Sequence, residues 1–215
     1  AKVLAQEGTH LVLLSRNQEA LEELDHEIRE RYDVQTVMSV MDLALEGASQ
    51  ALYKQLEQKN IKISVLVNNA GLGQYDLFVE SSPQRTAEMI AVNIKALTDL
   101  SQIFLPDMIQ SRHGHILNIA SLAGFFPGPF MAVYFATKAY VVSFSQGLRE
   151  ELSGSGVHLT VFCPGPLLTP FWKKARADHT PLSSSFLMPP LLAEKAALKA
   201  CNALKNNQFL CIPSL

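Results

Sequence analysis

Three side chains in the second half of the chain could together transfer a proton to or from an oxygen atom. Tyr134 and Lys138 lie four residues apart in a stretch with helical periodicity. On a helix this spacing puts two side chains about 40° apart around the axis and about 6 Å apart along it. A phenol has an ordinary pKa of about 10, and a neighbouring ammonium group lowers that pKa by stabilising the phenolate. Ser121, at the end of the preceding predicted strand, could hold a substrate oxygen while Tyr134 exchanges the proton.

This arrangement predicts acid–base chemistry at a carbonyl or alcohol, and the prediction depends on its setting. A tyrosine and a lysine at this spacing also occur together by chance. Taken alone, Lys138 is also compatible with a solvated lysine on a helix surface. The catalytic interpretation rests on Ser121 ending a strand thirteen residues before Tyr134, on consecutive elements of a parallel α/β fold.

Asn93 stands out because it lies within an apolar helical stretch, MIAVNIKAL. Asparagine is a mediocre helix former that prefers caps, so its place here needs an explanation. One explanation is an inward amide that holds a water molecule near Lys138. The other is a side chain that faces solvent, and the sequence leaves both open.

The segment Asn68-Asn69-Ala70-Gly71 follows a strand predicted at 63–67. Amides and a glycine at the carboxyl end of a strand can bond neighbouring backbone and let a cofactor approach closely. An ordinary Asx turn is the alternative. Asn68, Ala70 and Gly71 are therefore candidate cofactor-binding residues.

Ser15 and Arg16 follow a strand predicted at 9–14. In dinucleotide folds this strand end meets the adenosine ribose, where an acidic residue favours NAD. An arginine instead suits the 2′-phosphate of NADP through bidentate bonds. Asp42 could accept a hydrogen bond from the adenine amino group, or it could cap the following helix.

Strands and helices alternate along the whole chain. Apolar strands alternating with amphipathic helices predict a parallel sheet with helices on both faces, a doubly wound α/β fold. The predicted helices are 1–7, 17–31, 45–59, 83–110, 131–152 and 191–205, and the predicted strands are 9–14, 34–38, 63–67, 115–120, 157–162 and 208–212. Gly8 is placed to end the first helix, and Pro106 is expected to bend the end of the fourth.

Length and composition predict one domain spanning residues 1–215, since 48% of its residues are hydrophobic and 18% charged. A net charge of −2 without a basic cluster argues against nucleic-acid partners. No apolar run reaches the roughly 20 residues of a membrane helix, and the six histidines lack metal-ligand spacing. Three scattered cysteines predict buried thiols and hence a reducing, cytoplasmic location.

A Pro- and Ser-rich stretch at about 165–190 contains several apolar residues, among them Phe171, Trp172 and Phe186. Such anchors favour a substrate lid, and a plain surface loop is the alternative. Together with the apolar GFFPGPFMAV before Tyr134, the lid predicts a lipophilic substrate.

Taken together, these segments resemble the short-chain dehydrogenase/reductase family. The matching pieces follow the family's order and cover nearly the whole chain: NNAG at 68–71, Asn93, NIASLAG at 118–124, YFATK at 134–138 and CPGPLLT at 163–169. The resemblance implies a Rossmann-like sheet and hydride transfer between a nicotinamide cofactor, NADP(H) rather than NAD(H), and a small carbonyl or alcohol.

The resemblance also implies a role for each matched position. Tyr134 is the acid/base, Ser121 orients the substrate oxygen, and Lys138 lowers the tyrosine pKa and bonds the nicotinamide ribose. Asn93 completes a proton-relay water chain. The family's PG-x-x-x-T stretch, which holds the nicotinamide amide and pyrophosphate, corresponds to Pro164, Gly165 and Thr169.

The family's first strand and its TGxxxGIG turn have no counterpart in this sequence. That strand is expected between the strands at 9–14 and 63–67, so we expect the chain to be a fragment that binds cofactor poorly. A non-catalytic protein that senses cofactor or acts as a scaffold is the alternative function. By analogy with the family, helices 83–110 and 131–152 are expected to form a homodimer or homotetramer interface.

Overall fold

The strands form a middle layer in which every pairing is parallel. The computed structural model describes residues 1–177 and 189–213. A four-stranded sheet has the order β3 (Val65–Asn68), β4 (Gly114–Ile119), β5 (Val157–Phe162) and β8 (Leu210–Cys211), while β1 (Leu11–Ser15) pairs with β2 (Thr36–Val40) and β6 (Leu167–Leu168) with β7 (Leu191–Leu192).

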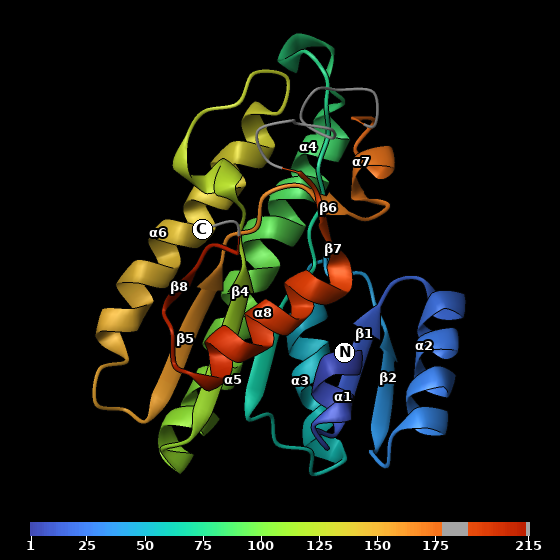
Figure 1. Cartoon of the computed structure of the whole chain (residues 1–215), viewed down its shortest axis with the longest axis vertical. Helices are drawn as coiled ribbons and strands as arrows, with labels where there is room; N and C mark the ends of the chain where they lie inside the picture. Colours follow the sequence, from blue (N-terminus) through green and yellow to red (C-terminus); the bar gives the residue numbers. More distant parts are fainter. Residues whose placement is uncertain (178–188, 214–215) are drawn as a thin grey trace.

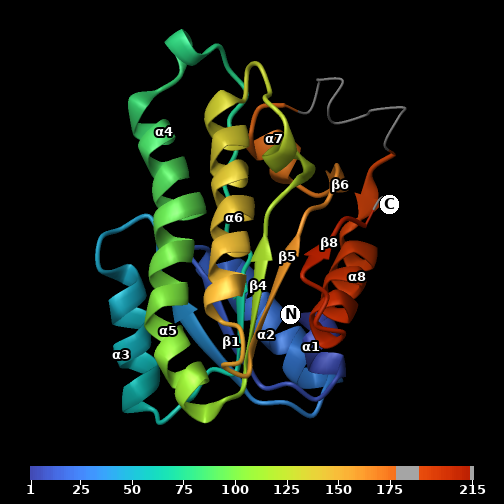
Figure 2. The ribbon, with the colours of Figure 1, turned by 90° about the vertical axis from the view of Figure 1, so that its left-hand side faces the viewer.

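Helices cover both faces of this layer, as Figures 1 and 2 show. One face carries α3 (Ala48–Gln58), α4 (Pro83–Ile90), η2 (Ala91–Ala96), α5 (Leu97–Ser111) and α6 (Ala132–Glu151). The other face carries α1 (Lys2–Gln6), α2 (Gln18–Arg31) and α8 (Ala193–Lys205). The predicted doubly wound α/β architecture is confirmed. Three short helices, η1 (Phe78–Glu80), η3 (Leu122–Phe125) and α7 (Phe171–Lys174), lie beyond the carboxyl ends of the strands.

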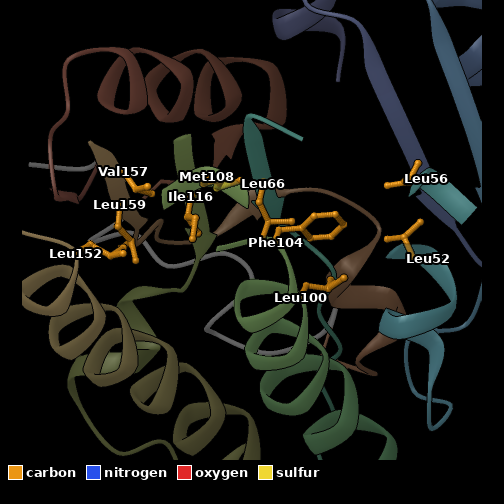
Figure 3. Close-up of a cluster of buried hydrophobic side chains, with 10 residues drawn as sticks. All are labelled: Leu52, Leu56, Leu66, Leu100, Phe104, Met108, Ile116, Leu152, Val157 and Leu159. Atoms are coloured by element: carbon orange, nitrogen blue, oxygen red, sulfur yellow. The ribbon is translucent and has the colours of Figure 1, made fainter. Parts of the chain in front are cut away.

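The largest apolar cluster lies between the four-stranded sheet and the helices α3 and α5 (Figure 3). Ile116 of β4 and Met108 of α5 are almost completely buried there. Alternate strand residues point to this face, and residues three or four apart on the helices meet them. Burial of this cluster favours the packing of α3 and α5 on the sheet.

The sheet divides between β1 and β3. Among the described residues, β1 pairs only with β2, and β3 pairs only with β4. This is the position at which the family's first strand is expected. The two strands flanking the division therefore each keep one edge without a ladder partner in the described part of the chain.

The helix predicted at 83–110 is one continuous helical run with a change of pitch at its centre. Its first part is α4, its middle part η2 is a π-helix, and α5 continues to Ser111. Pro106 lies inside α5 and does not end it, so the expected bend does not terminate the helix. The run ends at Arg112, whose φ of 52° lies in the left-handed region. Single π-turns of this kind often accompany functional sites.

Most other predicted boundaries agree with the structure to within three residues. Gly8 follows the first helix with a φ of 79°, as expected for a glycine at a helix end. The strand predicted at 34–38 is displaced to Thr36–Val40, and the last strand has only two residues. The stretch predicted as a lid contains β6 and α7. Its residues 178–188, including Phe186, lie outside the described part of the chain.

Candidate active site

The carboxyl ends of β3, β4 and β5 and the first turns of α6 meet at one end of the sheet. Gly71 follows β3, Ser121 follows β4, and Pro164 follows β5, while Tyr134 and Lys138 project from α6. The carbonyl oxygen of Pro164 accepts hydrogen bonds from the Leu122 amide at 3.0 Å and from Ser121 Oγ at 3.4 Å. The fold thus brings together segments that are nearly one hundred residues apart in the chain.

Asn93 points into the core and does not face solvent, and this decides between the two orientations that the sequence leaves open. The residue is only 2% exposed. Its amide oxygen accepts from the Leu72 amide at 2.8 Å, and its Nδ2 donates to the Leu72 carbonyl at 2.9 Å and to Thr137 Oγ1 at 3.0 Å. The side chain therefore joins η2 to the segment after β3 and to α6. The water molecule proposed between Asn93 and Lys138 stays a prediction.

Lys138 is a buried lysine, 5% exposed, with few polar neighbours. Its Nζ donates to the Ile119 carbonyl at 2.8 Å and lies 5.9 Å from the centroid of the Tyr134 ring. Burial lowers the pKa of Lys138 to about 8, an effect opposed in part by the Cys163 thiol. Within the described part of the chain this buried ammonium has one hydrogen bond, an expensive arrangement that is typical of functional sites.

Tyr134 is half-buried, and its hydroxyl lies in a poorly solvated environment. Burial raises the pKa of Tyr134 to about 12, while hydrogen bonding from Ser121 opposes this rise. Desolvation is therefore the larger effect at the phenol, and the expectation that Lys138 lowers the tyrosine pKa stays a prediction. In this structure the Lys138 ammonium is directed to the Ile119 carbonyl.

The asparagine that opens the NNAG segment is part of the core rather than of the open cleft. Asn68 is 6% exposed, and its Nδ2 donates to Asn118 Oδ1 at 2.8 Å and to Ser101 Oγ at 3.2 Å. Asn118 in turn donates to Ser145 Oγ at 2.9 Å. This polar network joins β3 and β4 to α5 and α6, which corrects the expectation that Asn68 faces a cofactor. Asn118 is signalled in the sequence only as a polar residue in the apolar strand HILNIA.

Ala70 and Gly71 are exposed at the strand end, beside the candidate catalytic groups. A Cβ atom added at Gly71 would lie 3.6 Å from Lys138 Nζ and 3.7 Å from Asn93 Oδ1. The backbone at Gly71 therefore lies beside both side chains. This arrangement fits the ribose and nicotinamide end of a dinucleotide, which Lys138 and the Gly71 backbone would hold.

The PG-x-x-x-T stretch lies beside Ser121 and leads into α7. Pro164 is buried, Gly165 is half-buried, and Thr169 Oγ1 accepts from the Phe171 amide at 3.4 Å. The Thr169 amide donates to the Leu167 carbonyl at 3.0 Å. The structure brings Pro164 next to Ser121, whereas Thr169 is at the start of α7. Their contacts to a cofactor stay predictions.

The candidate adenosine-binding residues lie together at the carboxyl ends of β1 and β2. Arg16 forms ion pairs with Glu88 of α4 and with Asp42, the latter at 3.6 Å, and its pKa is raised mainly by the hydrogen bond to Glu88. Asp42 also accepts a hydrogen bond from the Ala44 amide at 2.9 Å. Asp42 does not cap α3, because the N-cap residue of α3 is Gly47. Ser15 Oγ accepts from the Asn17 amide at 3.1 Å. Glu88 was not expected at this site, because it is 72 residues from Arg16.

A small cavity opens beside Tyr134. Phe78, Met89, Phe130 and Met131 supply most of its apolar lining, and Gln74 and Asp76 supply polar groups. Neither Gln74 nor Asp76 was singled out from the sequence, where they lie in an irregular segment without periodicity. Within residues 1–177 and 189–213, no group of three potential metal ligands and no helix suited to crossing a membrane is found.

Comparison with known proteins places this chain within one family. The profile described as short chain dehydrogenase matches residues 1–180. The very-long-chain 3-oxoacyl-CoA reductase of Macaca fascicularis is 35% identical over 168 residues, covering 76% of this chain and 53% of that protein. An uncharacterized oxidoreductase of Staphylococcus saprophyticus is 34% identical over 170 residues, covering 79% of this chain and 73% of the relative. The chain therefore belongs to the short-chain dehydrogenase family.

Solved structures agree with this assignment. A short-chain dehydrogenase from Sphingobium yanoikuyae in complex with NADPH superimposes with a TM-score of 0.90 at 31% identity, covering 100% of this chain and 82% of the other. The bulky-bulky ketone specific alcohol dehydrogenase from Comamonas testosteroni gives a TM-score of 0.84 at 27% identity, covering 100% and 80%. The chain spans about half the length of the 3-oxoacyl-CoA reductases that it matches, 53% for the Macaca fascicularis protein.

Proposed function

We propose that the protein is an NADP(H)-dependent reductase or dehydrogenase of lipophilic carbonyl compounds or alcohols. The observation that carries this proposal is the convergence of Ser121 with Tyr134, of Tyr134 with Lys138, and of Lys138 with Asn93 beside the backbone of Gly71. The full-length protein is expected to oxidise NADPH when a lipophilic ketone is supplied. Binding of NADPH without turnover of any carbonyl compound would instead favour the cofactor-sensing or scaffold alternative.

A nicotinamide held by Lys138 and the Gly71 backbone would supply the hydride that the carbonyl carbon needs. Ser121 Oγ donates a hydrogen bond to the carbonyl oxygen and orients it toward the Tyr134 hydroxyl. Tyr134 transfers its phenolic proton to that oxygen as the C=O bond becomes C–OH. The protonated Lys138 stabilises the resulting phenolate through its charge, and Asn93 holds the backbone after β3 in place.

A lipophilic substrate is supported by the aromatic surroundings of Tyr134. The Tyr134 ring lies 5.4 Å, between centroids, from Phe171 of α7 and forms a cluster with Tyr75, Met131 and Phe135. Apolar walls of this kind bind hydrocarbon and exclude water from a developing charge. The names of the relatives mention very-long-chain 3-oxoacyl-CoA and bulky ketones, which belong to the same chemical range.

We expect Arg16 to select NADP(H) by exchanging its carboxylate partners for the 2′-phosphate. Arg16→Asp should therefore weaken NADPH binding at least tenfold more than NADH binding, since a bidentate charged contact is replaced by repulsion. Glu88→Gln should strengthen NADPH binding several-fold, because it removes the carboxylate that competes for Arg16. Calorimetric Kd values for both cofactors, measured on the full-length protein, provide the test.

Glu80→Gln is the matched control, because Glu80 is exposed in η1 and carries the same charge change. It should leave the NADPH to NADH affinity ratio unaltered. An unchanged ratio in Arg16→Asp would remove Arg16 from cofactor selection. NAD-bound relatives are known as well, such as the dehydrogenase from Burkholderia phymatum at 26% identity and a TM-score of 0.84, so this ratio has to be measured.

We propose a homodimer that packs α5 and α6 of two copies together. The exposed face of α6 carries a groove of about 280 Å³ lined by Tyr140, Phe144, Gly147 and neighbouring residues, and the rings of Tyr140 and Phe144 are stacked at 5.8 Å. A Cβ atom added at Gly147 would meet nothing within 4 Å, so a larger residue is tolerated in the single chain. Such an open, aromatic helix face suits close packing against a second copy.

Gly147→Arg is expected to convert the dimer to a monomer without lowering the melting temperature of the chain. The arginine would occupy the groove and prevent the two α6 helices from approaching, while replacing a helical glycine favours the helix by up to about 1 kcal/mol. Sedimentation equilibrium measures the association state, and circular dichroism measures the melting. Gln58→Arg, on an exposed position of α3, is the control. A dimer of unchanged affinity in Gly147→Arg would rule out this interface.

We propose a reducing compartment such as the cytoplasm. All three cysteines are free and buried, and burial raises the pKa of each thiol, to about 12 for Cys163. A thiol with a raised pKa forms little thiolate and is chemically inert. Protein isolated from its native source and then denatured should show three free thiols in a thiol titration, in agreement with this location.

A further inference from the structure

Gln74 is a buried amide whose oxygen lacks a hydrogen-bond donor. The side chain is 7% exposed, and its Nε2 donates to Asp76 Oδ2 at 2.8 Å. Among the residues that the structure describes, no group donates to Gln74 Oε1, although this atom is buried. Buried carbonyl oxygens are nearly always paired in folded proteins, so Gln74 Oε1, like the buried Asn68 Oδ1, needs an explanation.

Asp76 determines which end of the Gln74 amide is left unpaired. A carboxylate oxygen accepts hydrogen bonds and cannot donate them, so the amino end of the amide must face Asp76. The flipped amide would place its oxygen against the carboxylate, which is repulsive. The free end of Gln74 is therefore an acceptor, and it can be satisfied only by a donor such as a hydroxyl or an amide N–H.

Hydrogen bonds fix the backbone before and after Gln74, and this restricts where its side-chain amide can point. The backbone groups of Leu72 are bonded to Asn93, the Tyr75 amide donates to the Ala175 carbonyl at 2.8 Å, and the Asp76 amide donates to the Phe130 carbonyl at 2.9 Å. A Cβ atom at Gly73 would lie 2.5 Å from Phe171 Cζ, which shows how closely α7 packs on this segment. Such a fixed acceptor is pre-organised for a ligand.

Gln74, whose Oε1 atom is itself buried, lies beside the same cavity as Tyr134. Gln74, Asp76 and Tyr134 all line this cavity, whose remaining walls are largely apolar. The carbonyl oxygen of a substrate is already assigned to Ser121 and Tyr134 in the proposed reaction. A substrate group that pairs with Gln74 therefore belongs to another part of the same molecule.

We infer that Gln74, oriented by Asp76, forms a polar subsite that selects carbonyl substrates carrying a hydroxyl or amide N–H apart from the reacting group. The inference rests on the proposed function and narrows its substrate class. Gln74 is a specificity-determining residue, and Asp76 acts through it as a positioning residue. A substrate without the donor leaves Gln74 Oε1 unpaired, and sites built to pair a polar group discriminate strongly against analogues that lack it.

The test compares 2-decanone with hydroxy-2-decanones that differ only in the position of the hydroxyl, using full-length protein and NADPH. At least one hydroxyketone should have a kcat/KM about tenfold or more above that of 2-decanone, mainly through a lower KM. Gln74→Met, which keeps the side-chain shape, should reduce this ratio to near one. Asp76→Asn should reduce it partly, because the amide is no longer fixed in one orientation. Gln58→Met, on the exposed end of α3, should leave it unchanged.

The ratio of the kcat/KM values of two substrates, measured on one variant, does not depend on the fraction of that protein that is folded. A wild-type protein without preference for any hydroxyketone, or a preference that survives Gln74→Met, would overturn the subsite while leaving the proposed function intact. Turnover of neither compound would contradict the proposed function instead. The calorimetric Kd values of the same compounds for NADPH-bound wild type and Gln74→Met then decide the subsite, and equal values would refute it.

Discussion

Tyr134→Phe is expected to reduce kcat for carbonyl reduction by about three orders of magnitude, because it removes the hydroxyl that transfers its proton to the substrate oxygen. The ring remains in its aromatic cluster with Phe171 and Phe135, so the fold should be preserved. NADPH affinity should change only a few-fold. Initial rates of NADPH oxidation by the full-length protein, together with a calorimetric Kd, separate the loss of chemistry from a loss of binding.

Tyr53→Phe is the matched control for this substitution. Tyr53 lies on α3, where its hydroxyl donates to Asp107 at 3.1 Å, far along the chain from the candidate catalytic residues. The same loss of one oxygen atom there should leave kcat unaltered. Comparable turnover by Tyr134→Phe and wild type would disprove the assignment of Tyr134 as acid/base, whatever the cofactor preference.

Lys138→Met is expected to abolish most activity and at the same time to change how stability depends on pH. The charge that stabilises the Tyr134 phenolate is lost, so kcat should fall at least about a hundredfold. The buried ammonium is also a cost to the fold below its pKa of about 8. The stability difference between wild type and Lys138→Met should therefore vary with pH, and urea unfolding at a series of pH values measures it.

The direction of this pH dependence follows from the two states of Lys138. Its pKa is about 8 in the folded protein and near 10.5 in the unfolded chain, so the unfolded chain binds more protons between these values. Wild type should gain stability relative to Lys138→Met as the pH rises through this window. The total gain is on the order of 3 kcal/mol, and the Tyr134 contribution is common to both proteins.

Lys54→Met is the control, since Lys54 is exposed on α3 and should give a stability difference that is independent of pH. A flat difference for Lys138→Met between pH 8 and 10.5 would show that the ammonium is well solvated in the folded protein. The carbonyl-reducing activity of wild type should fall over the same range, because the neutral amine no longer stabilises the phenolate.

The alternation of strands and helices was predictable because it depends on local periodicity. Apolar residues at every second or every third and fourth position determine which faces are buried, and these patterns lie within single segments. Ser121, Tyr134 and Lys138 could be brought together in the same way, since parallel strands direct their carboxyl ends to one edge. What the sequence alone determined is the family, the doubly wound layers and the edge at which the chemistry is placed.

Only the tertiary structure decided how individual polar groups are paired. The sequence is compatible with either a solvent-facing or a buried Asn93, and the hydrogen bonds to Leu72 show that the side chain is buried. Asn68 belongs to a buried network with Asn118 rather than to the cleft. Arg16 pairs with the distant Glu88 as well as with Asp42, and the free acceptor of Gln74 depends on Asp76. Such pairings are set by contacts between residues far apart in the chain, and no periodicity within a segment records them.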